Sequence, residues 1–240
     1  MRVLNVNMTL DLVHGGGTAE RTFQISRNLA RAGVDCDLLV LDLGLTVAQL
    51  KALDGVRVFA LPSLNRRFYV PAVSPTKIRR VVKDADVVHL MGHWTLVNAL
   101  VYLFARYMKK PYVVCPAGAL PIYGRSRRLK RLYNAVIGRR IVRDADGHVA
   151  IVRGEIPQLE DYGVPAKGVC VIPNGIEPAD YRSHGQPALR DEHGVGDAPY
   201  VLFVGRLNEI KGPDLLLEAF AAASGEFPEH HLVFAGPTRG

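Results

Sequence analysis

Two cations beside a predicted strand end carry the clearest chemical signal in the sequence. Arg206 follows a strand that ends at Gly205, and Lys211 comes just before a predicted helix start at Gly212–Asp214. An arginine fork and a lysine point charge both bind phosphate oxygens well. The pair therefore predicts a binding site for a diphosphate. A solvated basic loop is the alternative interpretation.

A glycine-rich segment follows the first predicted strand and opens a helix. It contains Gly15, Gly16 and Gly17, and their backbone N–H groups could approach an anion at a helix N-terminus. A tight turn without a ligand is the alternative. Glu20 stands where a dinucleotide fingerprint would place its third glycine, so an oxidoreductase is disfavoured.

Two histidines lie where another predicted strand ends and a helix begins. His89 and His93 could each contact an acceptor or assist proton transfer, because imidazole titrates near neutrality. A buried structural role is at least as well supported for His89, so His93 is the preferred catalytic candidate. Trp94 offers a sugar-stacking face, although core packing is the more common role for such a residue.

Basic residues gather around a predicted amphipathic helix between Arg125 and Arg143. Such a segment can lie against anionic lipid or attract an acidic acceptor, and a solvated helix face is the alternative. Nucleic acid is not an expected partner, because the patch lacks interleaved aromatic residues and a groove-reading motif. The basic residues are Arg125, Arg127, Arg128, Lys130, Arg131, Arg139, Arg140 and Arg143.

Composition bounds the class of protein. The 240 residues are 48% hydrophobic and 22% charged, which is typical of a soluble globular chain and excludes disorder. The formal charge of +7 favours acidic partners, namely phosphorylated sugars, anionic lipid or nucleic acid. The three cysteines show no metal or disulfide spacing. We expect a cytoplasmic protein, with peripheral association at the inner membrane face as a further option, and with no metal and no cofactor.

Short apolar runs alternate with longer amphipathic stretches. This pattern predicts an α/β fold with a Rossmann-like, doubly wound parallel sheet. The first helix is expected from about Thr18, as N-cap, to Ala32, with Arg21, Arg27 and Arg31 on its polar face. The predicted strands are Arg2–Asn7, Cys36–Leu41, Val56–Leu61, Asp86–Leu90, Tyr112–Cys115, His148–Val152 and Val169–Ile172.

A Pro- and Gly-rich stretch divides the chain. We expect an acceptor-binding domain at 1–176, a linker at 177–198, and the start of a nucleotide-sugar-binding domain at 199–240. In this last part the pattern predicts a strand at Tyr200–Gly205, a helix at about Gly212–Ser224 and a strand at His231–Ala235. Two strands and a helix are too few to form an independent sheet domain.

Three segments resemble the family-four (group 1) retaining glycosyltransferases of GT-B fold. They read HGGGTAERTFQISRNLARAG from His14, IPNGIE from Ile172 and GRLNEIKGPDLLLEAF from Gly205. The resemblance implies a cleft between two Rossmann-like domains, with a nucleoside-diphosphate sugar as donor and no metal requirement. It implies that Arg206 and Lys211 hold the diphosphate. It also places Gly15–Gly17 and the pair Asn174 and Gly175 near the donor phosphate.

The sequence departs from that family at two places. Ala117 occupies the position at which many members carry a histidine that touches the transferred sugar. The family's later pair of glutamates would lie beyond Gly240. We therefore expect this chain to be truncated within its donor domain and inactive by itself.

The expected function is hexose transfer, with retention, from a nucleoside diphosphate to a saccharide or lipid-linked acceptor, as in polysaccharide biosynthesis. Two alternatives stay open: another Rossmann-like dinucleotide-binding enzyme, and a non-catalytic acceptor-binding fragment.

Overall fold

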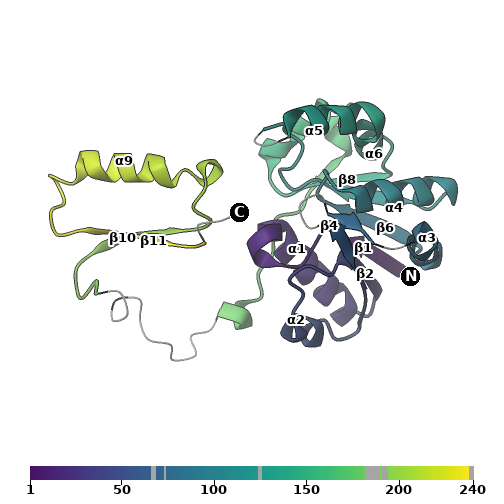
Figure 1. Cartoon of the computed structure of the whole chain (residues 1–240), viewed down its shortest axis with the longest axis horizontal. Helices are drawn as coiled ribbons and strands as arrows, with labels where there is room; N and C mark the ends of the chain where they lie inside the picture. Colours follow the sequence, from purple (N-terminus) through teal and green to yellow (C-terminus); the bar gives the residue numbers. More distant parts are fainter. Residues whose placement is uncertain (66–68, 73, 124–125, 182–189, 191–193, 238–240) are drawn as a thin grey trace. The chain divides into compact units, whose positions relative to one another are not determined.

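The computed structural model describes residues 1–65, 69–72, 74–123, 126–181, 190 and 194–237 (Figure 1). The chain divides into two compact units, Met1–Glu177 and Pro178–Gly240. Half of the predicted linker at 177–198, namely residues 182–189 and 191–193, lies outside the described residues, so the domain boundaries stay a prediction.

The first unit is built on a seven-stranded parallel sheet, which confirms the predicted α/β, Rossmann-like fold. The chain first runs from the central strand to one edge, and then returns to fill the other side. In sheet order the strands are β3 (Val56–Leu61), β2 (Asp35–Leu41), β1 (Arg2–Val6), β6 (Val87–Met91), β7 (Tyr112–Cys115), β8 (Gly147–Ala150) and β9 (Val169–Val171).

Helices cover both faces of this sheet (Figure 1). On one face Leu4, Leu39 and Leu90 pack in one core with Ile78 of α3 and Val101 of α4. On the other face, α1 contributes Phe23 to the cluster around Leu38 and Ile25 to the cluster around Met91. The helices are α1 (Leu12–Arg31), α2 (Val47–Ala52), α3 (Pro75–Asp84), α4 (Leu96–Tyr107), α5 (Arg127–Tyr133), α6 (Arg139–Arg143) and α7 (Ile156–Glu160).

Several short elements complete the unit. A two-stranded antiparallel pair, β4 (Ser63–Asn65) and β5 (Val70–Pro71), lies outside the main sheet. A π-helical turn, η1 (Asn134–Gly138), joins α5 to α6. Short 3-10 turns occur at η2 (Arg153–Glu155), η3 (Ala166–Gly168) and η4 (Pro178–Tyr181).

The first helix has an extra stretch ahead of its predicted start. A helical run begins at Leu12 and breaks at Gly16, whose φ of 54° and ψ of −141° are not helical. The continuous helix begins directly after this break, close to the predicted start at about Thr18, but Thr18 has helical backbone angles and is therefore not its N-cap.

The predicted polar face of that helix is also wrong for two of its three arginines. Arg21 and Arg27 are only 3% and 5% exposed, whereas Arg31 is exposed. Arg21 is covered by the segment after β9, where it donates to the Pro173 carbonyl and the Asn174 side chain at 3.0 Å. Arg27 donates to Gln24 on the same helix at 2.8 Å.

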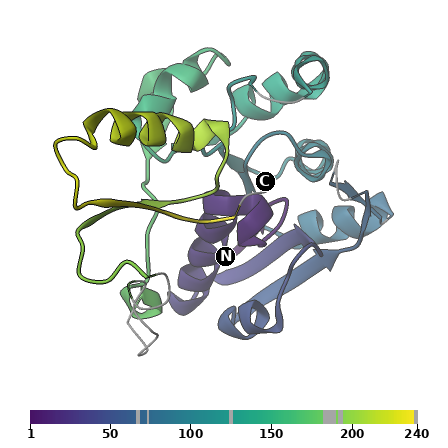
Figure 2. The ribbon, with the colours of Figure 1, turned by 60° about the vertical axis from the view of Figure 1, so that its left-hand side comes forward.

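The second unit repeats the predicted strand-helix-strand order. Strands β10 (Tyr200–Val204) and β11 (His231–Ala235) pair in parallel, and α9 (Pro213–Ala223) lies along one face of the pair in both views (Figures 1 and 2). No residue of α9 is buried, and Val204 and Leu215 are 75% and 67% exposed. The described part of this unit therefore leaves large apolar side chains uncovered.

Because of this exposure, we expect the backbone amides of the two units to be protected unequally from hydrogen exchange. An isolated two-stranded sheet is marginal in water, whereas central strands open only with global unfolding. Amides of β10 and β11 should exchange about a hundredfold faster than those of β1 and β6 in the 240-residue chain. Hydrogen exchange with residue resolution measures this, and equal protection in both sheets would contradict the expectation.

Candidate functional site

The sheet reverses its direction of winding between β1 and β6, which pair in parallel with Asn5 opposite His89. In such sheets the crevice outside the carboxyl ends of these two strands is the usual ligand site. The structure brings most of the predicted first-unit residues to this edge. Gly15–Gly17 follow β1, His93 and Trp94 follow β6, Ala117 follows β7, and Asn174 and Gly175 follow β9.

Packing and backbone conformation explain why two of the three positions carry glycine. A Cβ on Gly15 would approach the Cβ of Ala19 to 2.7 Å, and Gly16 has the positive φ that glycine tolerates. Asn7 fixes the segment from the sheet, because its side-chain amide donates to the Thr18 carbonyl at 3.2 Å. Gly17 has open space around it, so packing leaves room for a ligand there. A donor contact by these glycines stays a prediction.

His89 belongs to the interior beneath α1. Its Nδ1 lies 3.0 Å from Oδ1 of Asn5. Its Nε2 is buried and has no hydrogen-bond partner among the described residues. Burial lowers the pKa of His89 to about 4, and the nearby charge of Arg21 acts in the same direction. His89 is therefore neutral at pH 7, and its predicted acceptor contact stays a prediction.

His93 is buried in a polar and aromatic cage and is only 2% exposed. Its Nε2 lies 2.9 Å from Oδ1 of Asn134, whose amide nitrogen donates to the Tyr162 hydroxyl at 2.6 Å. The Tyr162 hydroxyl in turn donates to the Leu120 carbonyl at 3.1 Å. Because Asn134 Oδ1 can only accept, His93 Nε2 carries the proton. Burial lowers the pKa of His93 to about 4.

The π-helical turn makes this network possible. Asn134 is the first residue of η1, and it is buried although its neighbours Ala135 and Val136 are exposed. Tyr133 donates from its hydroxyl to the His93 carbonyl at 3.0 Å. The loop that carries His93 is thus held directly by the basic helical segment. The sequence signalled the histidine but not its asparagine partner, because a π-turn has no simple residue pattern.

Trp94 lies between the His93 loop and the basic segment. Its indole N–H donates to the Ala119 carbonyl, and the ammonium of Lys130 lies 5.4 Å from the centre of its ring. Lys130 also donates to the Tyr123 carbonyl at 3.0 Å. The contact between Lys130 and Trp94 thus joins a predicted acceptor residue to the basic segment that is predicted to meet an anionic membrane. In the sequence these were separate features.

The basic segment also exposes large apolar side chains. Leu129, Leu132 and Val136 are 52%, 59% and 61% exposed on α5 and η1. The described arginines of the segment are exposed on α5 (127, 128 and 131) and on α6 (139, 140 and 143). Arg125 lies outside the described residues.

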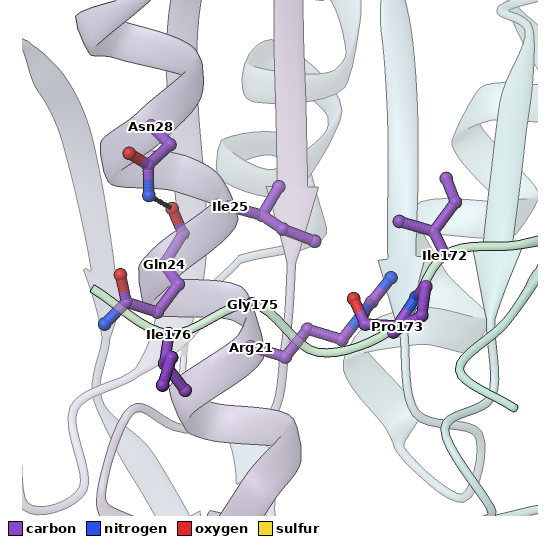
Figure 3. A pocket seen from close by; sticks show the side chains of 8 residues that line it. All are labelled: Arg21, Gln24, Ile25, Asn28, Ile172, Pro173, Gly175 and Ile176. Carbon is purple, nitrogen blue, oxygen red and sulfur yellow. Dashed lines mark hydrogen bonds between the residues drawn. The ribbon is translucent and has the colours of Figure 1, made fainter. Parts of the chain in front are cut away.

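Arg21 is a residue that sequence reasoning misplaced. Its Nη1 donates to the Pro173 carbonyl and to Oδ1 of Asn174, both at 3.0 Å. Figure 3 shows the Arg21 side chain running from α1 beneath the segment that follows β9. The spacing of Arg21, Ile25 and Asn28 on one helical face was the available signal, since Ile25 packs in the core.

The predicted cationic pair belongs to the second unit. Arg206 follows the end of β10, and Lys211 ends the 3-10 turn η5 (Glu209–Lys211). Gly212 then adopts a left-handed φ of 66°, and Pro213 begins α9. Neither cation pairs with a carboxylate within the described ranges. Binding of a diphosphate by this pair stays a prediction.

Comparison with known proteins identifies the family. Residues 16–175 match the family described as Glycosyl transferase 4-like domain, and residues 185–240 match Glycosyl transferases group 1. The chain belongs to the group 1 glycosyltransferases. A D-inositol 3-phosphate glycosyltransferase of Geodermatophilus obscurus is 26% identical over 243 aligned positions, which cover 89% of this chain and 51% of the relative. One from Kineococcus radiotolerans is 40% identical over 112 positions, 43% of this chain and 26% of the relative.

Solved structures agree on the fold. The crystal structure of Anabaena HepE in complex with UDP-glucose has a TM-score of 0.70 at 16% identity, over 98% of this chain and 60% of that one. A UDP-GlcNAc 2-epimerase of Neisseria meningitidis has a TM-score of 0.61 at 17% identity, over 100% and 66%. At these identities the likeness concerns the fold alone. The chain spans about half the length of the G. obscurus relative.

Two further properties bear on the site. Among the described residues, no group of three or more His, Cys, Asp and Glu side chains has the arrangement of a metal site. No helix found in those residues has both the length and the hydrophobicity to cross a bilayer.

The buried imidazole of His93 predicts acid sensitivity. Its pKa is about 6.5 when unfolded and about 4 when folded, so the unfolded chain takes up the proton first as the pH falls. The stability contribution is complete above about pH 6.5 and declines toward pH 4. Between pH 7 and pH 5 the loss should be about 2 kcal/mol from His93.

Urea unfolding at both pH values measures this loss. His93→Gln keeps a hydrogen-bonding side chain but does not titrate, so it should lose about 2 kcal/mol less than the parent between the two pH values. His89 is present in both proteins, so its contribution to the pH dependence of the unfolding free energy cancels in the comparison. The same pH dependence in parent and variant would show that His93 does not have a depressed pKa.

Proposed function

We propose that the full-length protein is a retaining glycosyltransferase that moves a sugar from a nucleoside diphosphate to a saccharide or lipid-linked acceptor. The observation that carries the proposal is the pair Arg206 and Lys211, which flank the strand-to-helix connection of a unit that matches group 1 glycosyltransferases. Two cations without carboxylate partners at that position suit a diphosphate.

The proposed reaction is a same-face displacement. The bond between the anomeric carbon and the departing phosphate oxygen breaks, and the anomeric carbon bonds to the acceptor oxygen. The acceptor proton passes to the departing phosphate. Arg206 and Lys211 offset the negative charge that grows on that phosphate, an effect strongest where positive groups are already positioned.

Other residues have supporting roles in the proposal. Gly17, Asn174 and Gly175 offer the donor backbone groups at the carboxyl edge of the first sheet. Trp94 offers a ring face near the acceptor. We do not assign His93 a direct catalytic contact, because its imidazole is enclosed by protein atoms; it instead positions the Trp94 loop.

The similar proteins suggest which donor and acceptor should be tested first. HepE was solved with UDP-glucose, so a UDP-sugar is the first donor to try. The curated relatives are D-inositol 3-phosphate glycosyltransferases, and the basic character of this chain suits a phosphorylated or lipid-phosphate acceptor. A different Rossmann-like enzyme, such as an epimerase with the same fold, is the alternative. The family matches favour the transferase.

Within this proposal, the 240 residues alone have little activity. The support is the small, exposed second unit and the roughly twofold greater length of the relatives. A donor held only by its phosphates lacks the orientation that accelerates transfer.

Removal of either cation should weaken donor binding. In the full-length protein, Arg206→Ala and Lys211→Ala should each raise the Kd for UDP-glucose about tenfold or more, since a charged hydrogen bond is worth about 1.5–3 kcal/mol. Lys167→Ala removes an exposed cation of the first unit and serves as the matched control. Calorimetry provides the Kd, and unchanged values in both variants would remove the diphosphate assignment.

We further propose that α5, η1 and α6 form a basic surface that binds an anionic membrane, which would make the protein cytoplasmic and peripheral at the inner membrane face. Exposed leucines beside exposed arginines support this, because apolar side chains enter the bilayer boundary while cations meet anionic headgroups. The two properties occur on the same short elements.

Vesicle flotation tests the surface. The chain should float with vesicles that contain anionic lipid and not with neutral vesicles, and salt should weaken the association. Arg127→Glu with Arg128→Glu, or Leu132→Ser, should reduce the bound fraction several-fold. The pair Arg79→Glu with Arg80→Glu, exposed on α3, makes the same charge change elsewhere and should have a smaller effect. Equal recovery with both vesicle types at low salt would favour a solvated face.

A further inference from the structure

Arg21 is a buried cation whose hydrogen bonds to oxygen acceptors, among the described residues, go to one short segment. It is 3% exposed, and its Nη1 contacts the Pro173 carbonyl and the Asn174 side chain, both at 3.0 Å. Its Nε and Nη2 are buried without an oxygen acceptor within the described residues. A buried charge is expensive unless it is well bonded, so these two contacts are a large part of what holds the guanidinium.

The segment that Arg21 holds has few other attachments. After Ile172, whose N–H donates to the Ala150 carbonyl, the chain leaves β9 and runs exposed to Ile176. Among the described residues, the N–H groups of Asn174, Gly175 and Ile176 make no hydrogen bond to the protein. Arg31 pairs with Glu177 at 3.0 Å, but this pair is exposed and worth little.

The side chain and the segment together enclose a pocket of about 250 Å³ (Figure 3). Arg21, Gln24, Ile25 and Asn28 line it from α1, and Ile172, Pro173, Gly175 and Ile176 line it from the segment. The segment therefore crosses α1 without close packing along its whole length. The buried guanidinium determines its path where the packing does not.

We infer that Arg21 is a positioning residue, which holds Pro173, Asn174 and Gly175 in the arrangement that donor binding requires. The inference rests on the proposed function, because Asn174 and Gly175 are proposed to meet the donor. Arg21 also lies on the same helix as the break at Gly16, little more than one turn away. One helix thus presents both backbone segments that are proposed to approach the donor.

The first test concerns the segment alone and needs no ligand. In the parent, the backbone N–H order parameters of Asn174 and Gly175 should be near the rigid value of about 0.85, and in Arg21→Ala and Arg21→Lys they should fall below about 0.6, as measured by NMR relaxation. Lysine keeps the charge but cannot bond two acceptors as a planar fork does. Arg31→Ala breaks the exposed contact on the same helix and should leave both order parameters at the parent values.

The second test concerns donor binding in the full-length protein. Both Arg21 variants should raise the KM for UDP-glucose about tenfold while kcat falls less, because the reacting groups are unchanged. Arg31→Ala should change neither value. Arg21→Lys preserves the buried charge, and its thermal unfolding midpoint shows whether it is folded; if Arg21→Ala does not fold, the lysine variant decides.

Two results would overturn the inference. One is unchanged order parameters at Asn174 and Gly175 in folded Arg21→Lys. The other is lower order parameters with unchanged KM for the donor, which would make the contact merely structural. Failure of the parent to bind or use any UDP-, GDP- or ADP-sugar would instead count against the proposed function, and the order parameters would still show whether Arg21 holds the segment.

Discussion

The whole arrangement depends on one constraint, which is that a parallel sheet must be covered on both faces. Each connection from strand to strand has to cross a face, and helices do this while burying the alternate side chains of β1, β6 and their neighbours. As a result, every strand ends at the same edge of the sheet. Residues far apart in the sequence, such as Gly17, Trp94 and Asn174, therefore gather there without any direct contact between them.

The polar residues near this edge chiefly hold backbone in place. Asn7 fixes the glycine segment, Asn134 fixes the His93 loop, and Arg21 fixes the segment after β9. Each is buried, so each bond is formed away from competing water. A site organised in this way offers backbone groups and ring faces at its surface, and the buried His89 and His93 below it remain neutral. That division suits a reaction in which the substrate's own phosphate accepts the proton.

The sequence predicted the fold well because its signals are local. The apolar runs at Val56–Leu61 and Tyr112–Cys115 match strands with the same bounds. Burial of single polar residues was harder to predict. Arg21 follows a polar spacing along the helix but lies under a segment about 150 residues away, and Asn134 turns inward only because of a π-turn. Ala117, at the family's histidine position, has a φ of 52°. An alanine in the sequence gives no indication of a positive φ. These features depend on tertiary contacts, which a window of sequence does not contain.

We propose that the second unit holds the donor diphosphate between Arg206 and Lys211, neither of which pairs with a carboxylate among the described residues. A crystal structure of the full-length protein with UDP-glucose is the most direct test. We expect diphosphate oxygens within about 3.2 Å of both the Arg206 guanidinium and the Lys211 ammonium. A bound diphosphate held by other groups, with Arg206 and Lys211 facing solvent, would contradict it.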